Sequence, residues 1–216
     1  MHHLDPTQLD ALLRWRYAVK RFDPDRKVPD DTWDALQRSL VLAPSSFGLQ
    51  PWKFLVVEDR NLREQLRGAS WNQSQVIDAD RYVVFTALRT TTSEDVDRYL
   101  ERQCEVRGTE IDALSGYRDI IVQFLESGWA AEDLHGWNAR QTYLSLGQFM
   151  TAAATLGVDT CPMEGINLTA YDELLDLKDS RYATLCACAV GYRHAEDKYA
   201  DAQKVRFALD DVVERR

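Results

Sequence analysis

The sequence predicts one domain in which α-helices pack around a β-sheet. Three apolar runs of strand length, rich in β-branched and aromatic residues, lie at 52–57, 82–88 and 182–192. Stretches in which apolar residues recur at helical spacing separate these runs, and the longest is 137–158. No linker-like segment divides the chain, so we expect a single domain over residues 1–216.

The composition excludes several classes of function. A formal net charge of -9 argues against nucleic acid or an anionic membrane as the main partner. The four cysteines (Cys104, Cys161, Cys186 and Cys188) show no CxxC spacing, which favours buried free thiols over disulfides or a metal site. The stretch Met1–Asp5 lacks the apolar core of a signal peptide, so we expect a cytoplasmic protein.

Two helices are predicted before residue 43. The sequence Asp5-Pro6-Thr7 is typical of a helix start, and apolar residues follow at Leu9, Leu12 and Leu13. Pro29 and the acids after it begin a second helix, whose buried stripe is predicted to comprise Trp33, Leu36, Leu40 and Val41. Between the helices, residues 16–22 concentrate positive charge. Taken alone, that segment is better explained as a solvated helix end than as a ligand site.

The stretch Ala43–Val57, which reads APSSFGLQPWKFLVV, combines a polar loop with a buried strand. Pro51 can open a strand but not occupy its middle, so the boundary between loop and strand is well defined. A hydroxyl-rich loop held against a strand is a common place to bind a small ligand. An ordinary connection between a helix and a strand would have the same residues, so this stretch alone does not distinguish a ligand site from a simple connection.

The middle of the chain alternates helices and strands. A short polar helix is predicted at 60–67, closed by Gly68, and a polar connector at 71–78 leads to the strand 82–88. The continuous apolar character of that strand is typical of a central position in a sheet. Residues 94–127 predict two helices joined near Gly108 or Gly116, an excursion suited to a lid or a specificity wall.

The helix predicted at 137–158 carries no charge from Gln141 onward. Its uncharged length meets that of a membrane span, but its Gln, Thr and Ser residues make it too polar for that. We therefore expect a core helix covered on nearly all sides, ended by Gly157. Gly147 and the alanines 152–154 would permit close approach of another helix, either inside the subunit or across a dimer.

The last quarter of the chain is predicted to contain one turn, one helix, one strand and a tail. Residues 162–165 form the turn, 169–177 a small helix, and 182–192 a strand that is apolar on both faces. The tail from His194 to Arg216 is too charged for the core, and we expect it to cover another surface. It carries a second cationic pair, Lys204 and Arg206.

No standard hydrolytic, metal-binding or nucleotide-binding motif is present. The sequence contains no GxSxG, HExxH, Walker loop or GxGxxG pattern, and its histidines lack metal-ligand spacing, so no metal site is predicted. An enzyme of this kind would depend on a bound cofactor rather than on a nucleophilic side chain.

Four blocks in order along the chain resemble the FMN-dependent nitroreductases of the bacterial oxygen-insensitive type. They are RYAVKRFD at 16–23, APSSFGLQPW at 43–52, PMEG at 162–165 and KVR at 204–206. The resemblance implies an α+β, three-layer sandwich with a mixed, mainly antiparallel sheet flanked by helices. It also implies an intertwined homodimer with FMN at the interface, in which the segment from about 194 to 216 reaches the partner subunit.

The resemblance implies an FMN site drawn from all four blocks. A phosphate with nearly two negative charges needs cations around it, and Arg16, Lys20, Lys204 and Arg206 could converge on it. A backbone N–H near Glu164 would face flavin N5, so no side chain is predicted to be catalytic. The implied cofactor-binding residues are Arg16, Tyr17, Ala18, Lys20, Pro44, Ser45, Ser46, Asn72, Gln75, Pro162, Met163, Glu164, Gly165, Lys204 and Arg206.

Three residues depart from the pattern of the family: Ala18 stands for a serine, Gly48 for an asparagine and Gln75 for a lysine. A neutral Gln75 would stabilise the anionic reduced flavin less than a lysine, which predicts a lower reduction potential than that of a Gln75→Lys variant.

The implied activity is an NAD(P)H-dependent, ping-pong reduction of nitroaromatics, quinones or related small electrophiles, with NADH or NADPH as co-substrate. Phe47, Trp71 and Phe124 are candidate acceptor-binding residues, although core packing is the favoured role for Trp71 and Phe124. Two alternatives remain open at this point, a flavin or pteridine reductase on the same fold and a flavin-binding or redox-sensing protein with little turnover.

Overall fold

A four-stranded sheet lies at the centre of the computed structural model, which describes residues 3–216. The strands are arranged in the order β1-β2-β4-β3, and every neighbouring pair is antiparallel. Their bounds are β1 (Trp52–Val56), β2 (Arg81–Leu88), β3 (Asp159–Met163) and β4 (Tyr182–Gly191). The predicted central position of the second apolar run is confirmed, since β2 is buried along almost its whole length.

Helices account for most of the remaining chain. Their bounds are α1 (Pro6–Trp15), α2 (Asp30–Val41), α3 (Arg60–Gly68), α4 (Gln75–Asp78), α5 (Ser93–Arg107), α6 (Ser115–Ser127), α7 (Leu134–Thr155), α8 (Leu168–Leu174) and α9 (Leu209–Val212), with short 3-10 turns at Ser46–Gly48 and Ile111–Leu114. The predicted start of α1 is confirmed by a capping box, in which Asp5 and Gln8 satisfy each other's backbone N–H groups.

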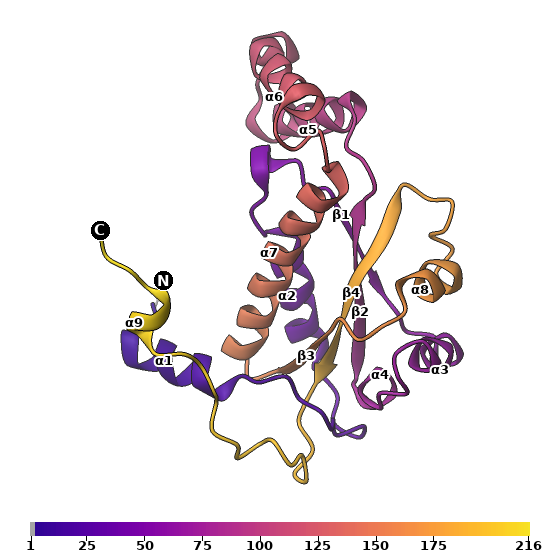
Figure 1. Cartoon of the computed structure of the whole chain (residues 1–216), viewed down its shortest axis with the longest axis vertical. Helices are drawn as coiled ribbons and strands as arrows, with labels where there is room; N and C mark the ends of the chain where they lie inside the picture. The colour runs from indigo at the N-terminus through magenta and orange to yellow at the C-terminus, as the bar shows by residue number, and fades with distance from the viewer. Residues whose placement is uncertain (1–2) are drawn as a thin grey trace.

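Helices cover both faces of the sheet, as Figure 1 shows. On one face, α2 and α7 pack against β2 and β4 through a core that includes Trp33, Leu36 and Phe149. On the other face, α3, α4 and α8 pack through a core that includes Leu66, Val76 and Tyr171. The predicted three-layer α+β sandwich is therefore confirmed.

An extended segment after α1 adds a parallel contact to the edge of the sheet. Ala18 forms an isolated parallel bridge with Thr160 of β3, and the Val19 N–H donates to the Thr160 carbonyl at 3.3 Å. The sheet itself is wholly antiparallel, which confirms the antiparallel part of the prediction, and this isolated bridge is a parallel contact outside its named strands. Its consequence for function is that the cationic segment 16–20 lies in extended form beside β3 rather than at a solvated helix end.

The excursion between β2 and α7 forms a helical hairpin with a core of its own. Helices α5 and α6 bury Val96, Leu100, Ile121 and Leu125 together. Gly108 ends α5 in the left-handed conformation with a φ of 66°, which confirms the predicted junction. The hairpin lies at one end of the sheet, beyond the start of α7 (Figure 1).

Helix α7 is less enclosed than the sequence predicts. One side packs on the sheet, but a second side leaves Tyr143, Leu144, Gly147 and Thr151 exposed. These residues recur at helical spacing, so they form one uncharged, exposed face of the helix. Within the single chain, the prediction of a helix covered on nearly all sides is therefore wrong. In residues 3–216, no helix combines the length and apolar character needed to cross a membrane.

Several smaller predictions are corrected. Val41 is 63% exposed rather than part of the buried stripe of α2. Gly68 belongs to α3, and Ala69, which follows it, keeps a negative φ, so no left-handed glycine closes that helix. Pro162 and Met163 lie in the edge strand β3, so the turn begins only at Glu164. The prediction about Met1–Asp5 partly concerns Met1 and His2, which lie outside the described residues.

Candidate functional site

A cavity of about 560 Å³ lies between the segment that follows α1, the edge strand β3 and the C-terminal tail. Segments from both ends of the chain meet at this cavity, as they do in Figure 1, where the tail runs beside α1. The residues from the predicted site that line it are Arg16, Tyr17, Ala18, Lys20, Pro162, Lys204 and Arg206.

The walls of the cavity carry positive charge that is not neutralised within the described chain. Its neighbours form ion pairs, Arg14 with Asp10 and Arg193 with Asp159, but in residues 3–216 no carboxylate pairs with Arg16, Lys20, Lys204 or Arg206. Burial lowers the pKa of Lys204, and the nearby guanidinium of Arg16 lowers it further. Such a cluster of cations favours the binding of an anion.

The Lys204 ammonium links the two ends of the chain directly. Its Nζ donates to the backbone carbonyls of Leu13 and Arg16 at the end of α1. A cation at the C-terminus of a helix interacts favourably with the unsatisfied carbonyls there. The predicted convergence of cations almost two hundred residues apart is thus present within one chain.

Arg193 and Asp159 hold the cationic segment against the sheet. Arg193 Nη2 lies 2.6 Å and Nε 3.0 Å from the two carboxylate oxygens of Asp159, whose side chain is 4% exposed. The Arg193 guanidinium also lies over the rings of Trp15 and Tyr17, at 4.3 Å and 4.6 Å from their centroids. It therefore fixes the two residues on either side of Arg16.

Asp197 fixes the backbone of the same segment from the tail. Its Oδ2 accepts the N–H groups of Lys20 and Arg21 at 2.8 Å and 2.9 Å, and its Oδ1 accepts that of Tyr199 at 3.0 Å. Burial alone would raise the pKa of Asp197, but these N–H donors bring it below its usual value. The tail and the segment are thereby held at a defined separation across the cavity.

Tyr17 contributes a polar atom that lacks a partner. Its hydroxyl oxygen is buried and has no hydrogen bond within the described chain. Burial raises the pKa of Tyr17 to about 12, with the nearby Asp197 carboxylate as a further cause. The charged groups that act on this hydroxyl are Asp197, Arg193 and Asp159, so it belongs to the groups that anchor the segment rather than to the cluster of cations.

Lys20 and Gln75 approach the same buried thiol. Lys20 Nζ lies 3.7 Å and Gln75 Nε2 3.9 Å from the sulfur of Cys161 in β3. Burial raises the pKa of the Cys161 thiol. Gln75, itself 4% exposed, is thereby placed beside the cation cluster. A lysine at position 75 would add a second cation next to Lys20, which gives a physical reason for the neutral residue.

The predicted ring-binding residues of the 71–75 and 162–165 segments also meet. Gln73 Nε2 donates to the Gly165 carbonyl at 3.1 Å, and the Trp71 ring lies over Gly165 so closely that a Cβ there would be 2.7 Å from Trp71 Cζ3. Trp71 and Asn72 both have a positive φ, and Trp71 is 80% exposed. Core packing is therefore wrong for Trp71, which instead covers Gly165 from the solvent side.

Glu164 is held by a residue from the uncovered face of α7. The Tyr143 hydroxyl donates to Glu164 Oε1 at 2.5 Å. Burial raises the pKa of Tyr143, and its hydrogen bond to Glu164 raises it further. This contact fixes the carboxylate beside Met163 at the end of β3, and so helps to set the backbone at Glu164.

The loop with Pro44, Ser45 and Ser46 is not brought to the cavity. The Ser46 N–H donates to Gln141 Oε1 at 2.9 Å, near the start of α7, whereas Met150 of α7 lines the cavity. Met150 lies nine positions after Gln141 along the helix, a rise of about 14 Å. Within one chain, the serines and the cation cluster therefore lie at different ends of α7.

The α5–α6 hairpin clamps that loop. The Phe47 ring packs against Tyr117 and Phe124, with ring centroids 6.5 Å and 5.1 Å away. Tyr99 lies over Gly48, which has a φ of 81°, and a Cβ on Gly48 would be 2.5 Å from the Tyr99 hydroxyl oxygen. A glycine is thus required here, which explains one departure from the family pattern. The packing role predicted for Phe124 is confirmed.

Sequence reasoning did not identify Asp159, Cys161, Arg193 or Asp197 as parts of the site. Each acts on a residue far away in the sequence, and Arg193 and Asp159 are 34 residues apart. The only local signal is weak: Arg193 follows a strongly apolar strand, and a charged residue there must find a partner. Among residues 3–216, no group of His, Cys, Asp or Glu side chains is arranged to hold a metal ion.

Comparisons with known proteins are consistent over nearly the whole chain. The model of the Nitroreductase family matches residues 13–192. A Staphylococcus aureus (strain USA300) protein called "Putative NAD(P)H nitroreductase" is 34% identical over 221 residues, which cover 99% of this chain and 97% of that protein.

Two solved structures share the fold. One is described as a "putative NAD(P)H:FMN oxidoreductase" from Staphylococcus epidermidis, with a TM-score of 0.82 and 23% identity, and the match covers 100% of both chains. The other is described as a "putative nitroreductase in complex with FMN" from Exiguobacterium sibiricum, with a TM-score of 0.79 and 20% identity, covering 100% of this chain and 99% of that one.

Proposed function

This chain belongs to the nitroreductase family, and from that membership we propose that it is an FMN-dependent NAD(P)H oxidoreductase acting on nitroaromatics, quinones or related small electrophiles. The observation that carries the proposal is the cavity in which Arg16, Lys20, Lys204 and Arg206 lack carboxylate partners within residues 3–216. A terminal phosphate with nearly two negative charges matches that cluster. FMN is bound in the Exiguobacterium relative.

The residues around the cavity would make different kinds of contact with the phosphate of FMN. Arg16 and Arg206 offer guanidinium groups for bidentate contact with the phosphate, while Lys20 and Lys204 act as point charges. Ala18 offers its backbone at this wall but no hydroxyl, so fewer contacts to the phosphate are expected here than in relatives with a serine.

The ring would be held by the segments joined through Gln73 and Gly165. Asn72 and Gln75 would meet its pyrimidine edge, and Pro162, Met163, Glu164 and Gly165 its other side, with a backbone N–H near Glu164 facing N5. When bound, FMN supplies the hydride chemistry, taking a hydride from NADH or NADPH and delivering it to the acceptor. The chain itself contributes position, charge and exclusion of water, and no side chain is required as a nucleophile.

Trp71 and Phe47 are proposed to contact the acceptor. Trp71 covers Gly165 from the solvent side, so it is placed to limit access to the reactive face of the ring. Phe47 belongs to the clamped loop, and Phe124 supports it by packing. One pocket that serves both the nicotinamide and the acceptor leads to ping-pong kinetics.

We further propose that two chains complete each site. Pro44, Ser45 and Ser46 lie about 14 Å along α7 from the cavity of their own chain, so a second chain docked on the uncovered α7 face would supply them. The exposed apolar residues of the tail, such as Val205 and Phe207, suit a segment from about 194 that extends over the partner. The single domain 1–216 would then be one half of a homodimer.

Flavin binding and reduction test the function. The purified protein should retain FMN, and its yellow colour should bleach when NADH or NADPH is added without oxygen. Parallel double-reciprocal plots with an acceptor would support ping-pong turnover, whereas converging lines would contradict the shared pocket. Bleaching with no turnover of nitroaromatics or quinones would favour a flavin or pteridine reductase or a redox sensor, and failure to bind FMN would reject all of these.

Mixed dimers test the shared site. A chain carrying Arg16→Gln and Lys204→Met is co-expressed with a chain carrying Ser45→Ala and Ser46→Ala, each with its own affinity tag. If each site draws on both chains, the mixed dimer has one intact site and one doubly altered site, and should bind FMN tightly at half of its sites. Two equally weakened sites would show that each chain builds its own.

A further inference from the structure

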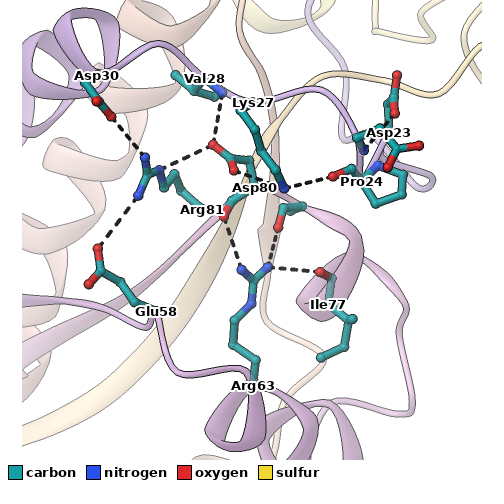
Figure 2. Close-up of polar contacts among 12 residues, drawn as sticks. Asp23, Pro24, Lys27, Val28, Asp30, Glu58, Arg63, Ile77, Asp80 and Arg81 are labelled. Carbon is teal, nitrogen blue, oxygen red and sulfur yellow. Dashed lines mark hydrogen bonds and ion pairs between the residues drawn. The ribbon is translucent and has the colours of Figure 1, made fainter.

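The buried guanidinium of Arg63 in α3 is unusual because it contacts backbone carbonyls rather than a carboxylate. Its Nε donates to the Val76 carbonyl at 2.6 Å, and its Nη atoms donate to the carbonyls of Ala79, Asp80 and Ile77 at 2.5 Å, 3.2 Å and 3.4 Å. Arg63 is 7% exposed. Figure 2 shows the Ile77 and Asp80 carbonyls at the Nη end of the Arg63 side chain.

The charge of Arg63 has no direct counter-ion in the described chain. The nearest acid, Asp80, offers Arg63 only its backbone carbonyl, while its carboxylate accepts the Val28 N–H at 3.0 Å and pairs with Arg81 and Lys27 on the other side (Figure 2). Burial lowers the pKa of Arg63. A buried cation is costly unless it is well hydrogen-bonded, so these carbonyls are its main compensation.

Arg63 in turn supplies the hydrogen-bond donors for these carbonyls. They lie in and just after α4, a helix of only one turn, whose last carbonyls have no partners within the helix. A guanidinium with five donors in a planar fork can satisfy several of them at once, which a point donor cannot. Arg63 therefore fixes the position of α4 on α3.

Helix α4 begins at Gln75, and Asn72 lies three residues before it. The Asn72 N–H donates to the Arg67 carbonyl at 3.1 Å, again on α3. Trp71 and Asn72 have φ values of 53° and 55°, a conformation that costs energy in most residues and persists only when its surroundings hold it. The segment between Trp71 and Ala79 is thus anchored on α3 at both ends, by Arg67 and by Arg63.

We propose that Arg63 is a positioning residue for the flavin ring, because it holds the segment that presents Asn72 and Gln75 to the pyrimidine edge. This inference rests on the proposed function. Asn72 and Gln75 carry side-chain N–H donors, which would stabilise the negative charge that the pyrimidine edge gains when the flavin is reduced. Loosening α4 should therefore weaken the binding of reduced flavin more than that of oxidised flavin.

The test measures the two-electron potential of FMN bound to Arg63→Lys, by equilibration with redox dyes. Lysine keeps the charge but cannot reach the same set of carbonyls. We expect the affinity ratio of reduced to oxidised flavin to fall about tenfold, which corresponds to a potential about 30 mV lower than in the unmodified protein. If the potential of the variant is unchanged, however far its melting temperature falls, then Arg63 has only a structural role and the proposal is overturned.

Arg89→Lys is the matched control. Arg89 also contacts backbone carbonyls, those of Ser180 and Leu177, and it pairs with Asp172 at 2.7 Å, but it does so on the loop after α8. Its replacement should lower stability and leave the potential unchanged. Lys204→Met gives a second contrast, since it should weaken both oxidation states alike. A shift in Arg89→Lys equal to that in Arg63→Lys would overturn the proposal.

Hydrogen exchange on the unmodified, flavin-free protein provides a measurement that needs no variant. The amides of Val76, Ile77, Asp78 and Ala79 donate to backbone carbonyls within 73–75. If Arg63 holds α4 in advance of binding, these amides should be protected before FMN is added. Protection that appears only with FMN would overturn the proposal. A protein that binds no FMN would instead reject the proposed function, whatever the exchange shows.

Discussion

The two ends of α7 show how differently one chain prepares two parts of a binding site. Near Met150, four cations from opposite ends of the sequence surround a cavity, and no carboxylate within residues 3–216 neutralises them. Near Gln141, the serine loop is held by contacts within its own chain. The Ser46 N–H donates to Gln141, Ser45 Oγ accepts the Gln50 N–H at 2.9 Å, and the Phe47 ring packs between two other aromatic rings.

The difference lies in what remains unsatisfied. At the cation end, repulsion among the unpaired cations persists until an anion binds, so binding and local stability are coupled. At the loop end, the Ser46 N–H bond to Gln141 and the packing of Phe47 hold the backbone in place, so the loop is preorganised without a ligand. The cation end would therefore become more stable when a ligand binds, whereas the loop end offers a surface whose shape is already set.

The largest expected effect comes from removing charge at the cation end. A chain with Arg16→Gln and Lys204→Met loses two charge-assisted contacts, each worth about 1.5–3 kcal/mol. The affinity for FMN should fall by about 10²–10⁴-fold, measured by fluorescence titration. The pair Arg102→Gln and Arg107→Gln removes the same charge from exposed sites on α5. If that pair weakened binding equally, the effect would belong to the overall charge of the protein and not to the cavity.

The next effect concerns the loop end. Gly48→Ala places a Cβ against the Tyr99 hydroxyl at a φ of 81°, so the free energy of unfolding should fall by about 2–4 kcal/mol. Urea unfolding measures it. In a Tyr99→Ala background, the steric part should disappear and the backbone part remain, which a double-mutant cycle separates. Additive losses would mean that Tyr99 does not restrict position 48.

A smaller effect is expected where the tail meets the cationic segment. Asp197→Asn should cost about 1–3 kcal/mol of unfolding free energy at pH 7, because charge-assisted bonds to the N–H groups of Lys20 and Arg21 are weakened. The folded pKa of Asp197 lies below its usual value, so its contribution is present above the ordinary pKa and is lost as the pH falls through the folded one.

The gap in stability between the native protein and the Asp197→Asn variant should therefore close as the pH is lowered from 7 into the acid range. Urea unfolding at several pH values measures this gap, and exposed Asp201→Asn serves as the control. A gap that stays constant with pH would contradict an ionised Asp197 as the anchor.

The smallest effect concerns Gln75, which lies beside Lys20 at the Cys161 thiol. Gln75→Lys should favour reduced flavin by about tenfold, which is about 30 mV in spectroelectrochemical titration. An equal or lower potential in the variant would reject this. Because the new lysine would face Lys20, the flavin-free variant should also be less stable than the native chain, and bound FMN should narrow that difference.

Local signals predicted the elements well. The capping box at Asp5 and the left-handed glycine at Gly157 mark helix ends through neighbouring residues alone. The convergence of Arg16 and Lys20 with Lys204 and Arg206 was implied by the resemblance to the family, since residues 16–22 taken alone indicated a solvated helix end. The anchors of the cavity were missed, since the pairing of Arg193 with Asp159 depends on which strands become neighbours.

Two further predictions were wrong for different physical reasons. The uncharged sequence of α7 predicted a helix covered on nearly all sides, whereas one of its faces is exposed in the described chain. Trp71 is apolar and was therefore assigned to the core, whereas the positive φ values at Trp71 and Asn72 turn its ring outward over Gly165. An apolar residue type favours burial, but the backbone conformation determines in which direction the side chain points.

The joining of Arg16 to Lys204 across the cavity also sets an order of events in time. Arg16 and Lys20 are synthesised within the first tenth of the chain, and Lys204 and Arg206 near its end. At 5–20 residues per second, about 10–40 s separate the first pair from the second. The inner strand β4 (Tyr182–Gly191) is also synthesised only just before Lys204, so neither the sheet nor the cluster of cations is complete until the chain is nearly finished. We therefore expect FMN to bind only after translation has passed Arg206, and a chain truncated just before Lys204 to be purified without bound FMN.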